Sequence, residues 1–136
     1  MVCIKTPIQS DRSAVKSFLS ELHAVIDAED FDINNQLVFI KAGKTEEEYS
    51  APYTIMDLEF DNEDVITTFK ELAIQEYSET LVDKDNDDPP LLYVFGKQIN
   101  QRQVYIKLKI REGRQKAIIC VSFHYSKHEM SFPYGR

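Results

Sequence analysis

The sequence is poor in cysteine and glycine and has no long apolar run, and each shortage excludes a class of protein. No apolar run approaches the ~20 residues that a membrane-spanning helix needs, and the N-terminal MVCIKTPIQSD lacks the apolar core of a signal peptide. The two cysteines, Cys3 and Cys120, are far apart and form no disulfide framework. These absences predict a protein of the reducing cytoplasm with no membrane partner. The four glycines are scattered, which excludes a glycine-rich phosphate loop.

The sequence does contain enough apolar material for one domain. Of its 136 residues, 43% are hydrophobic and 11% are aromatic, values typical of a globular protein. A chain of this length buries roughly two-thirds of its unfolded surface when it folds. No internal repeat or second domain is visible, so we expect a single domain over residues 1–136.

Charge is distributed unevenly along the chain, whose formal net charge is −7. Residues 57–88 carry twelve acidic residues against two lysines, a net −10, and DKDNDDPP (83–90) is expected to form an acidic loop. Residues 96–116 carry four lysines and three arginines against one acid, a net +6. The acidic total weakens long-range attraction of RNA, but the asymmetry permits a local anion-binding face.

Two segments have the apolar spacing of an amphipathic helix, residues 11–28 and residues 61–77. A short helix is expected over residues 50–58, and a short β-branched and aromatic strand over residues 37–41. His23 lies beside the first apolar stripe, where a structural role is expected. The stripes consist of Val15, Phe18, Leu19, Leu22 and Ile26 in the first helix, and Val65, Ile66, Phe69, Leu72 and Ala73 in the second.

Three C-terminal segments, residues 91–98, 103–111 and 116–124, predict an antiparallel meander. An even-numbered loop around Gly113 would keep the apolar sets of the last two strands on the core face. The expected fold class is therefore α+β, with an antiparallel sheet packed against two main helices and a short one. The apolar sets are Val104, Ile106, Leu108 and Ile110, followed by Ala117, Ile119, Val121 and Phe123.

This register places the polar side chains of the two strands on one surface. A phenol, an imidazole, a hydroxyl and a row of cations would then lie together. The residues are Tyr105, Lys107, Lys109 and Arg111 on the first strand, and Ser122 and His124 on the second.

Several chemistries lack the residues that they need on this surface. His124 and His128 are four residues apart, but His124 ends a strand and no third ligand is evident, so no metal site is expected. Ser122 lies near His124 without a nucleophile elbow, an oxyanion loop or a placed acid. We therefore expect neither a serine nucleophile nor a cofactor.

Metal-free RNA cleavage fits the surface better, because the RNA supplies its own 2′-hydroxyl as nucleophile. The protein then needs a base, an acid and cations near the phosphate. His124 can act as acid or base, and Tyr105 can donate a hydrogen bond or a proton. An alternative stays open at this point, since alternating lysines are also how an ordinary strand faces water and protects its edge.

Short motifs in the C-terminal half lie in a characteristic order: VFGKQIN (94–100), VYIKLKI (104–110), VSFH (121–124) and MSFPY (130–134). Together with IMDLEFDNEDV (55–65), they resemble one branch of the MqsR family. These are the motility quorum-sensing regulator toxins of type II toxin–antitoxin systems, and they are RelE-like. The resemblance extends loosely through the first helix.

The resemblance implies a compact RelE-like α+β domain that cleaves mRNA without metal and is blocked by a cognate antitoxin. The family's tyrosine in V-Y-x-K falls on Tyr105, and its C-terminal lysine after S-F falls on His124. The expected catalytic residues are therefore Tyr105 and His124, with Lys97, Lys107 and Lys109 as phosphate-binding residues.

Two positions depart from the family pattern. The lysine that some members carry after the second long helix falls on Glu79, and the glutamine before the tyrosine strand has no clear counterpart near Tyr93. Glu79 and the acidic balance favour an alternative function. In that alternative the chain is a degenerate, non-catalytic RelE-like module that engages an antitoxin or the ribosome.

Overall fold

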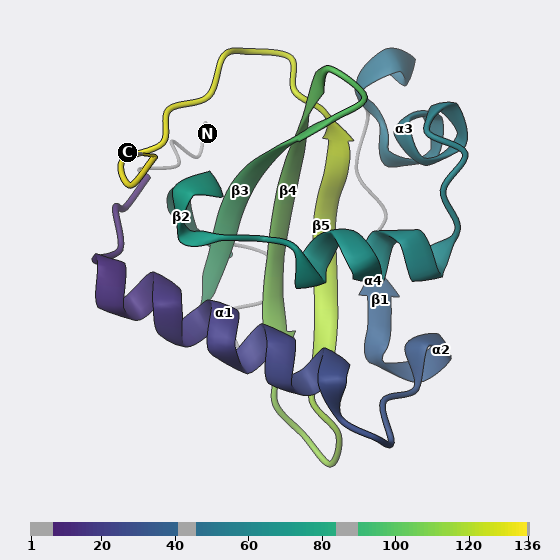
Figure 1. The fold of residues 1–136 in the computed structure, drawn as a ribbon, viewed down its shortest axis with the longest axis vertical. Helices are drawn as coiled ribbons and strands as arrows, with labels where there is room; N and C mark the ends of the chain where they lie inside the picture. The colour runs from purple at the N-terminus through teal and green to yellow at the C-terminus, as the bar shows by residue number, and fades with distance from the viewer. Residues whose placement is uncertain (1–6, 41–45, 84–89, 136) are drawn as a thin grey trace, which may run out of the picture.

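The computed structural model describes residues 7–40, 46–83 and 90–135, and their fold is α+β as the sequence predicts. Two helices, α1 (Arg12–Asp27) and α4 (Asn62–Lys70), cross one face of a five-stranded sheet (Figure 1). We call this the inner face and the opposite one the outer face. The strands in spatial order are β1 (Leu37–Phe39), β5 (Ala117–Tyr125), β4 (Arg102–Arg111), β3 (Leu91–Ile99) and β2 (Tyr77–Val82). Each neighbouring pair is antiparallel except β1 and β5, which are parallel.

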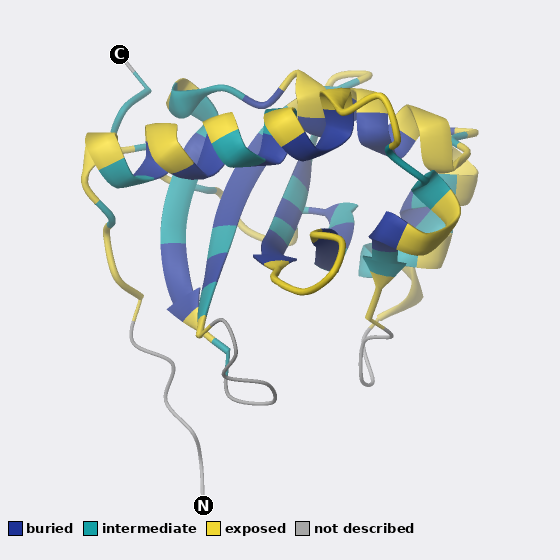
Figure 2. Cartoon of the chain, turned by 90° about the horizontal axis from the view of Figure 1, so that it is seen from below, coloured by how far each residue is buried: buried dark blue, intermediate teal, exposed yellow. Residues whose placement is uncertain are grey.

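Helix α1 confirms the helix predicted over residues 11–28. The Asp11 carboxylate accepts a hydrogen bond from the Ala14 N–H at 2.8 Å and so caps the first turn. The apolar side of α1 is turned toward the strands (Figure 2). There the Phe18 ring stacks on Tyr93 of β3 with centroids 4.2 Å apart. No helix within the described ranges is long and apolar enough to cross a membrane.

Short elements connect α1 to α4. Ser50 caps the third helix by accepting a hydrogen bond from the Tyr53 N–H at 3.3 Å. This helix confirms the one predicted over residues 50–58. The strand predicted over residues 37–41 is β1, and Lys41 lies outside the described residues. The connecting elements are α2 (Ile33–Gln36), the 3₁₀ turn η1 (Glu47–Tyr49) and α3 (Ala51–Asp57).

Helix α4 is shorter than the sequence predicts. It ends at Lys70, whereas the apolar spacing places the end near Tyr77. After the 3₁₀ turn η2 (Ile74–Glu76) the chain enters β2, an edge strand that was not predicted from the sequence. The spacing was misleading because Leu72 stays buried beyond the helix, and no glycine or proline marks the stop.

Strands β3, β4 and β5 confirm the predicted meander. The acidic loop predicted over residues 83–90 lies mostly outside the described residues. The loop between β4 and β5 is not even-numbered, because Arg111 pairs with Ala117 and leaves residues 112–116 between them. The prediction of an even-numbered loop was therefore wrong.

A β-bulge in β5 compensates for the odd number of residues in the loop between β4 and β5. Lys107 pairs with Ser122, but the next residue, Leu108, pairs with Cys120. Val121 is thus an extra residue in β5, and it reverses the alternation of faces along that strand.

The bulge decides which β5 side chains reach the main core. Ile118 and Cys120 lie in that core before the bulge, and Phe123 lies in it after the bulge. The sequence predicts Ile119 and Val121 on the same face as Phe123, which is wrong. Val121 packs on the outer face, and Ile119 is the cross-strand partner of a lysine there.

Apolar side chains are buried on both faces of the sheet. The main core fills the space between the helices and the inner face. A second, smaller group lies on the outer face, and we call it the outer cluster. It contains Leu81, Leu92 and Val94, with Tyr105, Val121 and Met130 packed against them.

After β5 the chain continues as an extended C-terminal segment, residues 126–135, which we call the tail. The Ser126 N–H donates a hydrogen bond to the Gln103 carbonyl at 2.8 Å. Near the other end, the Tyr134 ring stacks on Tyr77 of β2 with centroids 5.9 Å apart. The tail therefore returns from β5 to the opposite edge of the sheet, as the yellow trace in Figure 1 shows.

Candidate active site

Tyr105 and His124 lie side by side on the outer face. Tyr105 on β4 and His124 on β5 are direct cross-strand partners. Their rings stack with centroids 5.2 Å apart and planes 11° from parallel. Both side chains are half-buried. The structure thus brings together the two residues that the sequence singled out for proton transfer.

The environment of Tyr105 keeps its phenol protonated. Burial, followed by the negative charge of Glu79 on β2, raises the pKa of Tyr105 to about 12. At neutral pH the hydroxyl group can therefore donate a hydrogen bond or a proton but cannot act as a base. Its chemistry is that of a donor to a phosphate or leaving-group oxygen.

The ring nitrogens of His124 have different surroundings. Nδ1 lies 2.9 Å from the Tyr125 carbonyl oxygen. Because a carbonyl oxygen accepts hydrogen bonds, Nδ1 carries the hydrogen of the neutral ring and Nε2 holds the lone pair. No group in the described part of the chain hydrogen-bonds to Nε2. His124 can therefore accept a proton at Nε2 while Nδ1 holds the ring in place.

Lys107 and Ser122 form the next row of the outer face. They are cross-strand partners, and each is two residues from a member of the Tyr105–His124 pair, so all four side chains share a face. Lys107 is half-buried. It is the predicted phosphate-binding lysine that the structure places beside the pair.

Lys109 lies on the same strand but is buried. Its residue is 2% exposed, and its Nζ lies 2.8 Å from a carboxylate oxygen of Asp83. A buried lysine with a close acidic partner holds its charge through that partner. Lys109 therefore stabilises the outer face, and its ammonium group is not presented to a phosphate at the surface.

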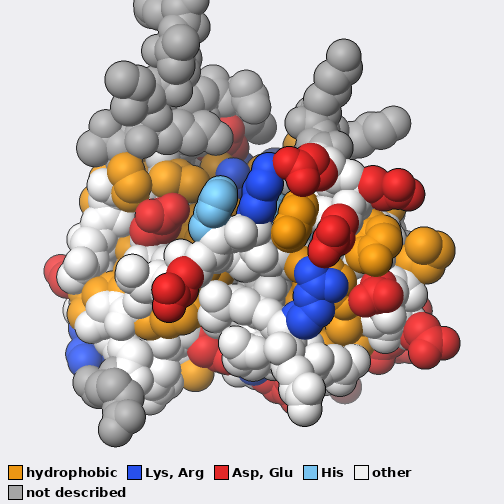
Figure 3. All heavy atoms as spheres, turned by 90° about the horizontal axis from the view of Figure 1, so that it is seen from above, with side chains coloured by type: hydrophobic (Ala, Val, Ile, Leu, Met, Phe, Trp, Pro, Cys, Tyr) orange, Lys and Arg blue, Asp and Glu red, His pale blue; other side chains and the backbone are white. Residues whose placement is uncertain are grey.

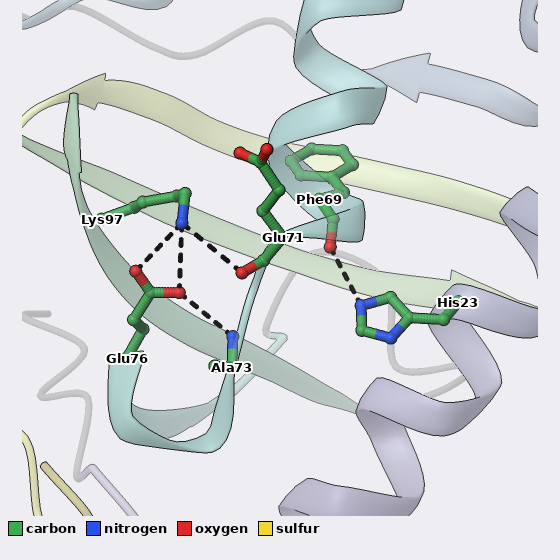
Figure 4. A network of polar contacts seen from close by, with 6 residues as sticks. All are labelled: His23, Phe69, Glu71, Ala73, Glu76 and Lys97. Atoms are coloured by element: carbon green, nitrogen blue, oxygen red, sulfur yellow. Dashed lines mark hydrogen bonds and ion pairs between the residues drawn. The ribbon is translucent and has the colours of Figure 1, made fainter.

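Lys97 points away from the predicted site. Its neighbour Phe95 lies in the main core, and alternation puts Lys97 on the same, inner face. Lys97 Nζ lies 3.2 Å from the Glu76 carboxylate and donates to the Glu71 carbonyl at 3.4 Å (Figure 4). The C-terminus of a helix carries partial negative charge, so a lysine there stabilises α4. The structure thus separates Lys97 from Tyr105.

His23 belongs to the same polar network. Its Nε2 lies 3.2 Å from the Phe69 carbonyl oxygen in the last turn of α4 (Figure 4). The same carbonyl also accepts a hydrogen bond from the Leu72 N–H at 3.2 Å, so His23 adds a second contact at the end of the helix. It links α1 to α4, which fits the structural role expected of His23.

Acidic side chains dominate the end of the molecule seen in Figure 3, and few lysines and arginines lie among them. At the β3–β4 turn, Arg102 Nη2 lies 3.4 Å from the Glu48 carboxylate. Nearby, Lys127 of the tail pairs with Glu46. These two cations are therefore each paired with a carboxylate.

Two tail residues border the site without having been predicted there from the sequence. Met130 packs against the outer cluster together with Tyr105, and Phe132 lies against β3 at Gly96. A signal was present in the sequence. A glycine inside a strand, such as Gly96, often marks a close approach of another segment to the backbone.

The described residues contain no group of three or more His, Cys, Asp and Glu side chains placed to hold a metal ion. His124 lies on β5, whereas His128 is an exposed residue of the tail. The two histidines therefore come from different elements and do not share a helical face.

No family model, no curated protein and no solved structure matches this chain. The resemblance to the MqsR family is therefore one of short sequence motifs alone.

Proposed function

We propose that this protein is a metal-independent endoribonuclease toxin of a type II toxin–antitoxin system, and that it cleaves mRNA at Tyr105 and His124. The observation that supports this is the stacked pair itself. It places a proton acceptor, His124 Nε2, beside a phenol that stays protonated. Lys107 in the next row adds a cation. An acid, a base and a positive charge are what cleavage by the 2′-hydroxyl requires.

In this mechanism His124 Nε2 takes the proton of the 2′-hydroxyl group. The 2′-oxygen then bonds to the adjacent phosphorus, and the bond from phosphorus to the 5′-oxygen breaks. Tyr105 donates a proton to that leaving oxygen, and the proton held by His124 returns to the phenolate through solvent. The products are a 2′,3′-cyclic phosphate and a 5′-hydroxyl end. Lys107 stabilises the extra negative charge on the phosphate.

The test uses purified protein with RNA and EDTA, followed by detection of 2′,3′-cyclic phosphate ends. His124→Ala and Tyr105→Phe should each lower the cleavage rate, by about 100-fold or more for the histidine. Both should also relieve growth arrest on expression while the fold stays intact by circular dichroism. His128→Ala is the matched control, because His128 is exposed on the tail. If the double variant were as toxic as the wild type, this site assignment would be wrong.

A second function is favoured by a separate observation. Lys109 is paired with Asp83, Lys97 caps α4, and Glu79 places negative charge near Tyr105. Little positive charge is then left for RNA, which fits a non-catalytic module that binds an antitoxin or the ribosome. RNA that stays intact at high protein concentration would support this second function and exclude the first.

A further inference from the structure

The tail approaches the sheet most closely at Gly96. A Cβ atom at this position would lie 2.7 Å from Met130 Sδ and 2.9 Å from Phe132 Cζ. Both distances are too short for real side-chain contacts, so the two tail side chains occupy the space that any other residue would fill. The missing side chain of Gly96 is what allows the tail to lie against β3.

Gly96 is in register with the candidate site. It pairs with Tyr105, and Tyr105 pairs with His124. Because β4 lies between β3 and β5, Tyr105 has Gly96 on one side and the His124 ring on the other. Met130 fills the space over Gly96, and Met130 and Tyr105 both pack against the buried residues of the outer cluster. Tyr105 therefore has the imidazole of His124 on one side and, on the other, the strand position over which Met130 lies.

The tail is anchored on both sides of Met130. Before it, the Ser126 N–H bonds to the backbone of β4. After it, the Ser78 hydroxyl of β2 donates to the Ser131 carbonyl at 2.8 Å. Farther along, the Tyr134 hydroxyl donates to the Ser10 carbonyl at 2.7 Å. These anchors keep Met130 over the sheet even though the tail has no regular secondary structure.

We propose that the tail is a strap over the active site and that Met130 is a positioning residue, which holds the Tyr105 ring in its stack with His124. The proposal rests on the proposed function for its effect on catalysis, but the packing that it describes does not. Removing the Met130 side chain opens space on one side of Tyr105, so the phenol can rotate away from the imidazole. A donor displaced by about 1 Å loses up to about 100-fold in rate.

The experiment follows the histidine rings by NMR in the wild type and in Met130→Ala and Met130→Leu. The chain has three histidines, and His124→Ala identifies the resonances of His124. The stacked ring of Tyr105 shifts these resonances, so the shift reports the pair directly. We expect Met130→Ala to reduce the shift, Met130→Leu to restore most of it, and the resonances of His23 to stay unchanged.

RNA cleavage is measured on the same variants. We expect kcat to fall at least about 10-fold in Met130→Ala, with little change in KM, and to recover in Met130→Leu. The Tyr105 ring shift of the His124 resonances could be lost in Met130→Ala while even the wild type cleaves no RNA. That result would support the strap and refute the proposed function. An unchanged shift, with or without cleavage, would refute the strap.

A measurement on the wild type covers the case in which Met130→Ala does not fold. The chain has three methionines, so the Met130 methyl resonance is readily assigned. The strap requires nuclear Overhauser contacts from this methyl group to the Gly96 α-protons and to the Tyr105 ring. Their absence would show that the tail does not lie over the site in solution.

Discussion

Lys109 and Asp83 make a buried ion pair on the outer face. Their side chains are 3% and 11% exposed, and the charged atoms lie 2.8 Å apart. Each of these buried charges has lost part of its hydration, and the attraction between the two charges compensates for that loss. Lys107, two residues earlier on the same face, is half-buried rather than buried. A lysine's function on this strand therefore depends on its neighbours in space.

We expect Lys109→Met to lower the free energy of unfolding by about 3 kcal/mol, since it removes one partner of a buried charge pair. Urea unfolding followed by circular dichroism measures the change. Lys116→Met is the matched control, because Lys116 makes an equally short ion pair with Glu21 at an exposed position. The control should leave stability unchanged. Equal effects in both variants would contradict a special role for the buried pair.

At the scale of elements, the C-terminus of α4 gives a structural role to two side chains of functional type, Lys97 and His23. Lys97 and His23 both contact carbonyl oxygens of the last turn or the residue after it. Glu76 supports this arrangement, because its carboxylate accepts a hydrogen bond from the Ala73 N–H at 3.0 Å while it pairs with Lys97. The helix end, the 3₁₀ turn and β3 are thus joined by one network.

Lys97→Met should therefore destabilise the protein by about 1 kcal/mol without changing RNA affinity, because Lys97 stabilises a helix end and does not face the site. Thermal unfolding measures the first quantity, and fluorescence anisotropy with labelled RNA measures the second. Lys107→Met provides the comparison, and it should weaken RNA binding. Reduced RNA affinity in Lys97→Met at unchanged stability would restore the original phosphate-binding assignment.

At the scale of the whole molecule, burial of ionisable groups links stability to pH. Burial raises the pKa of the Cys120 thiol to about 12, and burial with the charge of Glu79 raises that of Tyr105 to about 12. In the unfolded chain these groups ionise near pH 9.0 and 10.0. Because the folded-state pKa of each group lies above the unfolded one, the contribution of that group to the free energy of unfolding is fully present below the unfolded pKa. It is then lost as pH rises toward the folded one.

We therefore expect the free energy of unfolding to fall steadily between about pH 9 and pH 12. The phenol of Tyr105 accounts for about 2 kcal/mol of this decline, and Tyr105→Phe should flatten the curve by that amount. Urea unfolding at a series of alkaline pH values gives both curves. Parallel curves for the two proteins would mean that Tyr105 ionises as readily in the folded state as in the unfolded one.

Much of the fold could be predicted because its signals are local. The apolar stripe of α1, the Asp61 cap of α4 and the alternation in β4 depend on residues close together in the chain. The end of α4 and the strand β2 could not be predicted, since Leu72 continues the helical spacing after the helix has stopped. The β5 register also escaped prediction, because the bulge at Val121 has no sequence signal comparable to a turn glycine.

The sequence by itself determined the α+β class, the C-terminal meander and the identity of the residues on the outer face near Tyr105 and His124, because periodicity assigns a side chain to a face. Only the tertiary structure decided what those residues do. It paired Lys109 with Asp83, turned Lys97 toward α4 and laid Met130 over the sheet at Gly96. Each of these contacts joins segments distant in the chain, and their energies depend on burial and distance, which exist only after folding.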